Sequence, residues 1–341
     1  MPTMNINRNI FLFLLTALFT VIFLSCQNST KRNTIVTQSH DWHYFGQTPP
    51  GKAPELFQPE IISTRRNEHD ITISPFGSEV YYSMVLPAGK VKVILYLHFD
   101  GAFWSEPEVA YFSGVYNDIE PSFSPDGKKV FFASDRPIKK GGKPADYNIW
   151  YVEKGKSGWS NPVNLGAPVN TGNNEFYPSV SDSGKLFFTT KRPDSYGDDD
   201  IYFSEFVDGK YTEPVNVGIN VNSGLADFNA YVAPDESYLI FSSMGRDDSF
   251  GGGDLYISQW VNDTVWSIAK NLGKTINSEE LDYCPFVTFD GKYLFFTSNR
   301  SNPSLNTHYP KRFRNIISLA DEIKNGLGNI YWVKFDLAMY R

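Results

Sequence analysis

The stretch Phe123-Ser124-Pro125-Asp126-Gly127-Lys128-Lys129-Val130-Phe131-Phe132 decides the fold. Its Asp-Gly pair supplies the positive φ that a tight hairpin turn requires, and the apolar residues on either side predict two short strands. The stretch recurs in altered form, and its four further copies begin at Ile73, Val180, Val232 and Val287. Between the turn positions 76, 126, 182, 235 and 290 the spacings are 50, 56, 53 and 55 residues. Such self-similarity is typical of an array of repeated supersecondary units.

Each repeat predicts four antiparallel strands. The hairpin gives two, and a third follows at residues 91–97, 148–152, 200–204, 254–258 and 329–333. We expect the fourth at an aromatic-Ser/Thr-x-Pro motif or its variant, at residues 104–107, 159–162, 211–214 and 266–269. Proline fits an outer edge, where its missing N–H costs little. The predicted fold class is therefore all-β, a β-propeller of five four-stranded blades, with six blades as the alternative.

We expect the ring to close through the start of the domain. The fifth unit lacks a fourth strand, whereas residues 55–62 precede the first unit and resemble one. A strand at 55–62 that completes the last blade removes edges that would otherwise invite aggregation. The predicted propeller domain is 54–341, with blades at about 68–112, 118–168, 175–220, 227–275 and 282–335.

The last unit carries an insertion at residues 312–324 between its second and third strands. The spacing of Phe313, Ile316, Ile317 and Ile323 predicts an amphipathic helix. A helix that covers a blade edge is favoured over a helix that docks a partner.

The N-terminal segment differs from the rest of the chain. Arg8 precedes an apolar run at residues 10–24, which is short for a membrane span and typical of a signal-peptide core. The sequence Phe23-Leu24-Ser25-Cys26 resembles the lipobox of bacterial lipoproteins. The resemblance implies a signal peptide at 1–25 and lipidation of Cys26, followed by a flexible tether within 26–53. An ordinary signal peptide with an incidental cysteine is the alternative.

The repeats resemble a known propeller family. Residues 121–128, Ser134-Asp135-Arg136 and Asn148-Ile149-Trp150 are similar to the TolB-type, WD-like repeat, whose pattern is Pro-x-Phe-Ser-Pro-Asp-Gly-Lys, a Phe-Phe strand, Ser-x-Arg and Asp-Ile-Tyr. The resemblance covers about residues 54 to 335, and the longer units look like those of Gram-negative envelope proteins. The signal peptide and the lipobox resemblance imply secretion through the inner membrane and lipid anchoring, and the residues after Cys26 favour the outer membrane, facing the periplasm.

An acid recurs three residues before the proline position of every repeat, as Glu68, Asp118, Glu175, Asp227 and Asp282. Five-fold repetition places these acids in a ring near the start of the innermost strands. The ring is a candidate channel-mouth site for a ligand or for a metal such as calcium. A structural role is favoured, because four units carry an arginine that can clamp an acid, namely Arg136, Arg192, Arg246 and Arg300. The first unit has Leu86 there, so only Arg65 or Arg66 remains for Glu68.

Other candidate sites favour structural interpretations. The acidic loops around Asp200 and Asp254 lack the spacing of an EF-hand, and turn capping is favoured over calcium binding. If Cys26 is acylated, Cys284 has no disulfide partner, and a small buried side chain is favoured over a catalytic thiol.

Binding is favoured over catalysis. The net charge of −7 argues against nucleic acid as a partner. The five histidines show no metal-ligand spacing, no Gly-x-Ser-x-Gly motif occurs, and we predict no catalytic residue and no cofactor apart from the possible calcium. We expect a non-enzymatic envelope lipoprotein that binds a protein or a glycan. A glycan-active hydrolase or carbohydrate-binding propeller is the alternative, and an exposed aromatic platform beside two carboxylates would favour it, whereas a flat polar face would favour the first.

Overall fold

The structure is a computed structural model, and it describes residues 43–139, 141–156, 158–261, 265–303 and 312–340. The predicted signal peptide at 1–25, Cys26 and the tether up to residue 42 lie outside the described residues. None of the helices in the described ranges is long and apolar enough to cross a membrane.

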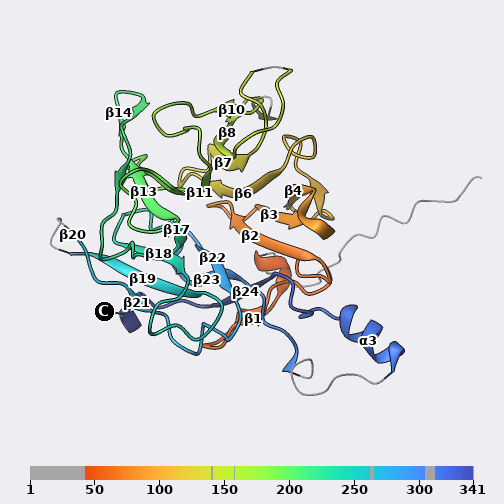
Figure 1. Ribbon diagram of the computed structural model, residues 1–341. Helices are drawn as coiled ribbons and strands as arrows, with labels where there is room; N and C mark the ends of the chain where they lie inside the picture. Colours follow the sequence, from red (N-terminus) through yellow and green to blue (C-terminus); the bar gives the residue numbers. More distant parts are fainter. Residues whose placement is uncertain (1–42, 140, 157, 262–264, 304–311, 341) are drawn as a thin grey trace, which may run out of the picture. The chain divides into compact units, whose positions relative to one another are not determined.

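The described residues form five antiparallel four-stranded blades (Figure 1). From the innermost strand outwards, blade 1 has β2 (Asn67–Ile73), β3 (Glu79–Val85), β4 (Lys92–His98) and β5 (Glu108–Val109). Blade 2 has β6 (Asp118–Phe123), β7 (Lys129–Ser134), β8 (Asn148–Gly155) and β10 (Val163–Asn164). Blade 3 has β11 (Glu175–Val180), β12 (Leu186–Thr190), β13 (Asp200–Ser204) and β16 (Val215–Asn216). Blade 4 has β17 (Asp227–Val232), β18 (Tyr238–Ser243), β19 (Asp254–Val261) and β21 (Lys270–Asn271).

Blade 5 joins the two ends of the domain. It contains β22 (Asp282–Val287), β23 (Tyr293–Ser298), β24 (Asn329–Lys334) and, as its outermost strand, β1 (Glu55–Leu56). Glu55 lies opposite Trp332 and Leu56 opposite Tyr331, and the N–H of Phe57 donates to the carbonyl of Ile330 over 2.9 Å. The predicted closure is confirmed, although the paired strand is shorter than residues 55–62 because the chain turns at Gln58, which has a φ of 45°.

The five innermost strands form a closed ring. β2 contacts β6, β6 contacts β11, β11 contacts β17, β17 contacts β22, and β22 contacts β2. The all-β, five-bladed architecture that the repeats predict is therefore confirmed.

The fourth strands begin later than predicted. The motif residues Ser105, Ser160, Thr212 and Ser267 instead donate their N–H groups to the carbonyls of His98, Glu153, Glu205 and Gln259, which lie in the last three residues of the third strand or directly after it. In blade 2 the chain pairs back with the third strand through β9 (Gly158–Trp159), and in blade 4 through β20 (Val265–Trp266). In blade 3 the chain after the third strand forms a hairpin of β14 (Phe206–Val207) and β15 (Lys210–Tyr211). Proline cannot donate to the ladder, so in blades 1 to 3 the outer strand resumes only after it.

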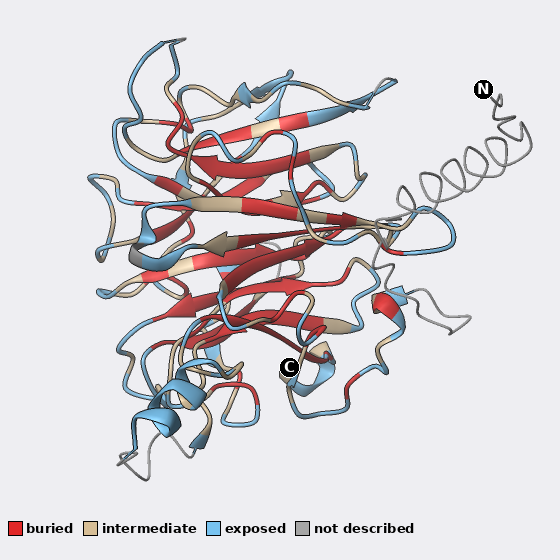
Figure 2. Ribbon diagram, turned by 90° about the vertical axis from the view of Figure 1, so that its right-hand side faces the viewer, coloured by how far each residue is buried: buried red, intermediate tan, exposed pale blue. Residues whose placement is uncertain are grey.

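Aromatic side chains fill the space between the blades, and Figure 2 shows that buried residues follow the strands while the loops are exposed. Phe57, beside β1, is fully buried, with ring centroids 4.9 Å from Phe295 and 5.2 Å from Trp332. In η1 (His43–Gly46), Phe45 is buried and stacks on Trp104 with centroids 4.0 Å apart. The packed structure thus begins before residue 54, because an aromatic side chain inside the polar segment reaches the core.

The predicted insertion helix is α3 (Phe313–Ala320), and none of its described side chains is buried. Phe313 is 77% exposed, and Ile316 and Ile317 are also exposed. This exposure does not fit a helix that covers a blade edge. Two further short 3₁₀ helices are η2 (Pro87–Gly89) and η3 (Leu337–Tyr340).

The closing contact can be tested with Phe57→Ala. Removing a fully buried phenylalanine should lower the free energy of unfolding by about 3–5 kcal/mol, measured by urea denaturation. The matched control, Phe313→Ala, removes an exposed phenylalanine and should change stability by less than about 0.5 kcal/mol. Similar losses in both variants would contradict the role of Phe57 in closing the ring.

Candidate functional site

The ring of acids predicted from the repeats lies at the start of the innermost strands. Asp118, Glu175, Asp227 and Asp282 are the first residues of β6, β11, β17 and β22, and Glu68 is the second residue of β2. All five side chains are fully buried. Because a buried carboxylate is costly unless it is bonded, the partners of each acid decide what the ring can do.

The three aspartates are paired with arginines of their own blades. The Nη2–carboxylate distance is 2.6 Å for Arg136 and Asp118, 2.7 Å for Arg246 and Asp227, and 2.7 Å for Arg300 and Asp282. The same Nη2 atoms also donate to backbone carbonyls, for example that of Ile276 over 2.7 Å from Arg300. These contacts fix the strand start to the end of the second strand of the same blade.

The two glutamates are held differently. Arg192 donates to the carbonyls of Pro168 and Val169 at 2.9 and 2.8 Å, and Glu175 accepts from the N–H and hydroxyl of Thr171 instead. Glu68 accepts from Thr64 and from Nδ2 of Asn329, while Arg65 pairs with Glu60. Burial raises the pKa of Glu68, and it raises the pKa of Glu175 to about 7. Binding of a ligand or calcium at this ring stays a prediction.

A second set of five residues lies two positions further along each innermost strand. Each interrupts the pairing register of its strand and adopts a positive φ, between 50° and 60°: Asp70, Glu120, Tyr177, Asn229 and Cys284. We call them the axial residues, because they are buried on the five innermost strands, and two of their contacts join blades that are not neighbours. Nδ2 of Asn229 lies 3.4 Å from Oε1 of Glu120, and the Tyr177 hydroxyl donates to the carbonyl of Pro285 over 2.9 Å.

The position of Glu120 has a local cause. The backbone N–H groups of Asp70, Glu120 and Asn229 donate to hydroxyls of the preceding blade, on Thr297, Ser83 and Thr189. At the equivalent position blade 2 has Ala133, which offers no hydroxyl to Tyr177. The carboxylate of Glu120 accepts that N–H instead, over 2.7 Å. Burial and the nearby Asp70 raise the pKa of Glu120 to about 8.

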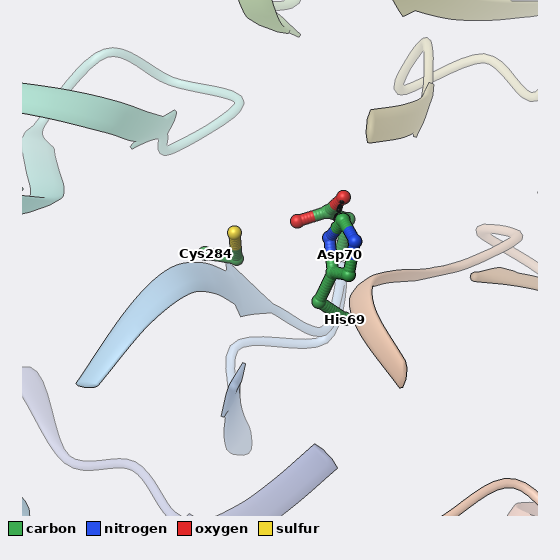
Figure 3. Close-up of side chains that lie close together, drawn as sticks. All are labelled: His69, Asp70 and Cys284. Atoms are coloured by element: carbon green, nitrogen blue, oxygen red, sulfur yellow. Dashed lines mark ion pairs between the residues drawn. The ribbon is translucent and has the colours of Figure 1, made fainter. Parts of the chain in front are cut away.

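His69, Asp70 and Cys284 form a cluster at the junction of blades 1 and 5 (Figure 3). Nδ1 of His69 contacts Oδ2 of Asp70, and one potential ligand atom from each of the three residues lies within 4.8 Å of the others. All three side chains are buried, and burial raises the pKa of the Cys284 thiol well above its usual range. A nitrogen, an oxygen and a sulfur atom together are a donor set that binds transition metals.

An open pocket lies where the first turns of blades 1 and 5 meet the N-terminal segment. It encloses about 600 Å³ including its mouth, and its walls include the five residues that we call the aromatic pocket: Tyr44, Phe57, Phe76, Trp104 and Phe289. Phe76 is 76% exposed and occupies the turn position that the other repeats give to Asp126, Asp182, Asp235 and Asp290.

The acidic loops are held by their own backbone. The carboxylate of Asp200 accepts from the N–H groups of Tyr196 and Gly197 and from Nδ2 of Asn216. Asp254 accepts from the N–H of Phe250 and from Nδ2 of Asn271. These bonds are those of turn capping.

The repeat pattern does not identify the axial residues as candidate functional residues. A signal was present, because a polar or sulfur-containing residue follows each ring acid by two positions inside an otherwise apolar strand. The five residues differ in chemical type, so the repeat alignment does not display them as a motif. The sequence also gave no hint that His69 meets Cys284, since their partnership depends on ring closure.

Comparison with known proteins shows the fold alone. No family model and no curated protein matches the chain. A solved structure of BT0996 in an RGII complex matches with a TM-score of 0.51 at 10% identity, over 84% of this protein and 91% of that one. The catalytic domain of the GH62 α-L-arabinofuranosidase of Coprinopsis cinerea matches with a TM-score of 0.48 at 10% identity, over 85% and 99%.

TolB from Acinetobacter baumannii is also similar, with a TM-score of 0.47 at 13% identity over 81% of this chain. This chain spans 59% of the TolB chain. At such identities neither binding nor hydrolysis is carried over from these structures.

A double-mutant cycle separates the two kinds of ring acid. Asp227→Asn with Arg246→Met should show a coupling free energy of about 1–3 kcal/mol in urea denaturation, because a buried ion pair is broken. The matched cycle, Glu175→Gln with Arg192→Met, should show a smaller coupling, since Arg192 donates to backbone carbonyls and acts on Glu175 through its charge without a direct bond. Equal couplings in both cycles would contradict the assignment.

Glu175 should make stability depend on pH. Its pKa rises from 4.5 to about 7 mainly through burial, with Arg192 lowering and Asp146 raising it. The folded state therefore holds a proton that the unfolded state releases, so this stabilisation is complete below pH 4.5 and is lost as pH rises through about 7. Glu175→Gln should remove a decline of about 3 kcal/mol between these values, as measured by urea denaturation at several pH values. The exposed Glu213→Gln should keep the wild-type decline, and a wild-type slope in Glu175→Gln would refute the assignment.

Proposed function

We propose that this protein is a non-enzymatic lipoprotein of the cell envelope whose propeller binds a protein partner at the aromatic pocket. The anchor in this proposal is the acyl group on Cys26, in the outer membrane facing the periplasm. The observation that carries the proposal is Phe76. A phenylalanine that is 76% exposed stabilises no core, and it replaces the aspartate of the other turns beside an open pocket. Exposed aromatic side chains in such places are typical of binding hot spots.

The lining favours an apolar side chain of a protein over a sugar. A sugar needs free hydrogen-bonding groups beside the aromatic rings, whereas the polar groups of this pocket are engaged by their own turns. The carboxylate of Asp290 accepts from Thr288 Oγ1 over 2.6 Å and pairs with Lys292. The hydroxyl of Ser74 accepts from the N–H groups of Ser78 and Glu79.

The hydrolase alternative requires two carboxylates that reach a substrate. Asp70 and Glu120 are close to the axis, but they are only 1% and 8% exposed, and Glu120 is bonded to Tyr177 and Asn229. Neither carboxylate is therefore open to a substrate in this structure.

The tether limits the distance between the pocket and the membrane. Position 26 and His43, which lines the pocket, are 17 positions apart, and a fully extended chain covers about 3.5 Å per residue. If Cys26 is acylated, the pocket therefore stays within about 60 Å of the bilayer surface. This reach supports a partner that is itself attached to the envelope.

Site-specific photo-crosslinking tests the proposal. A photoreactive amino acid at position 76 of the full chain, made in cells with their native envelope, should give a discrete adduct with one protein. The same amino acid at position 182, the equivalent turn of blade 3, which neighbours neither blade 1 nor blade 5, should not give that adduct. In an otherwise unmodified chain, Phe76→Asp should then weaken binding of the identified partner about 30-fold, as expected for a hot spot of about 2 kcal/mol.

Asp182→Ala, at the exposed turn of blade 3, is the control for that measurement and should leave the affinity unchanged. Identical adducts at positions 76 and 182, or adducts with glycan or lipid alone, would overturn the proposal. Binding of a partner that is unaffected by Phe76→Asp would show that the partner docks on another surface.

A further inference from the structure

The cluster of His69, Asp70 and Cys284 has the composition of a metal site. Blade 1 contributes the imidazole and the carboxylate through β2, and blade 5 contributes the thiol through β22 (Figure 3). The three residues are 8%, 1% and 2% exposed, and their ligand atoms lie within 4.8 Å of one another. Three different donor groups from two blades thus converge on one buried point.

Asp70 lacks the partners that the other buried acids have. Among the described residues its two carboxylate oxygens find no hydrogen-bond donor beyond the adjacent His69 imidazole and Cys284 thiol. The ring acids, by contrast, receive two or more bonds each from arginine, serine, threonine or backbone groups. An unpaired buried carboxylate is costly, so a cation at this point would satisfy it.

We propose that His69, Asp70 and Cys284 bind a zinc ion that links the first and last blades at the axis. Zinc takes nitrogen, oxygen and thiolate ligands in tetrahedral geometry, with bonds of about 2.0–2.3 Å. Two ligand atoms on one tetrahedral zinc are then about 3.3–3.8 Å apart, so the present cluster needs only small side-chain shifts to hold the ion. A thiolate ligand disfavours calcium and magnesium, which prefer oxygen.

The surroundings suit a bound thiolate. Three protein ligands leave the fourth tetrahedral position for a water molecule. Sγ of Cys284 lies 3.4 Å from Oδ1 of Asn229, whose Nδ2 in turn contacts Glu120, so the sulfur is part of a polar network at the axis. Outer contacts of this kind orient metal ligands and tune their affinity.

The placement has a structural consequence. β1 pairs with β24 at the outer edge of blade 5, whereas the cluster lies at the innermost strands of blades 1 and 5. Zinc would therefore link the first and last blades at the axis, where neighbouring blades contact each other without a continuous sheet.

Metal analysis of the full chain, purified in detergent without chelator, tests this. We expect one zinc per chain, a lower melting temperature after chelation, and recovery on addition of zinc alone. Zinc should also protect Cys284 from alkylation, read by mass spectrometry of the peptide that contains it. Cobalt(II) in place of zinc should give a thiolate-to-metal absorption band that Cys284→Ser abolishes.

His69→Gln and Asp70→Asn should each weaken zinc binding at least about 100-fold, whereas His98→Gln, in the same blade but outside the cluster, should not. If the variants fail to fold, the zinc-dependent melting temperature and alkylation of the wild-type chain decide the question. No zinc in the purified protein, together with a melting temperature and an alkylation rate that zinc does not change, would overturn the proposal. Zinc binding that survives all three cluster substitutions would also overturn it. Neither result would bear on the aromatic pocket.

Discussion

The convergence of five innermost strands on one axis is the constraint on which the rest of the structure depends. Each strand brings one residue to the centre in a left-handed conformation, which costs on the order of 1–3 kcal/mol for residues other than glycine. The N–H groups exposed by these irregularities still need acceptors. Hydroxyls of the preceding blade supply them for Asp70, Glu120 and Asn229, and Glu120 supplies the one that Ala133 cannot. The carboxylate of Glu120 thus lies at the centre partly because Ala133 has no hydroxyl to accept the N–H of Tyr177.

Each innermost strand is also held by its ring acid, which lies two residues before the axial residue. The ring acids are bonded to arginine, serine or threonine side chains, so the inner end of each blade is a polar network while the space between blades is aromatic. Buried polar groups that are fully bonded specify one arrangement, and packing alone tolerates several. This difference between bonded polar groups and apolar packing explains why all five repeats carry the ring acid and four carry the arginine, although the apolar residues vary between repeats.

The sequence was sufficient for the fold because the information is local and repeated. The Asp-Gly turns, the strand patterns and the missing fourth strand of the last unit predict five blades and their closure through β1. The outer strands begin later than predicted because the aromatic-Ser-x-Pro motif lies where the chain folds back on the end of the third strand. Only the pairing register distinguishes this segment from the outer strand itself. The cluster of His69, Asp70 and Cys284 could not be predicted, since His69 and Cys284 are 215 positions apart and meet only once the ring is closed. The five axial residues are of five different types, so the repeat gives them no common signature.

Departures from the repeat are therefore more informative about function than its agreements. Positions where the blades agree, such as the ring acids and the turn aspartates, have partners inside their own blade that account for them. Phe76 departs from the turn aspartate and gains no burial by doing so. Among the described residues, the carboxylate of Asp70 has no hydrogen-bond donor beyond His69 and Cys284, unlike that of Glu120. Both residues lie on blade 1 next to blade 5, Asp70 in the middle of β2 and Phe76 in the turn that follows it. A repeated fold can accept such departures most easily where its two chain ends meet, because the neighbouring N-terminal segment adds side chains that no other pair of blades has.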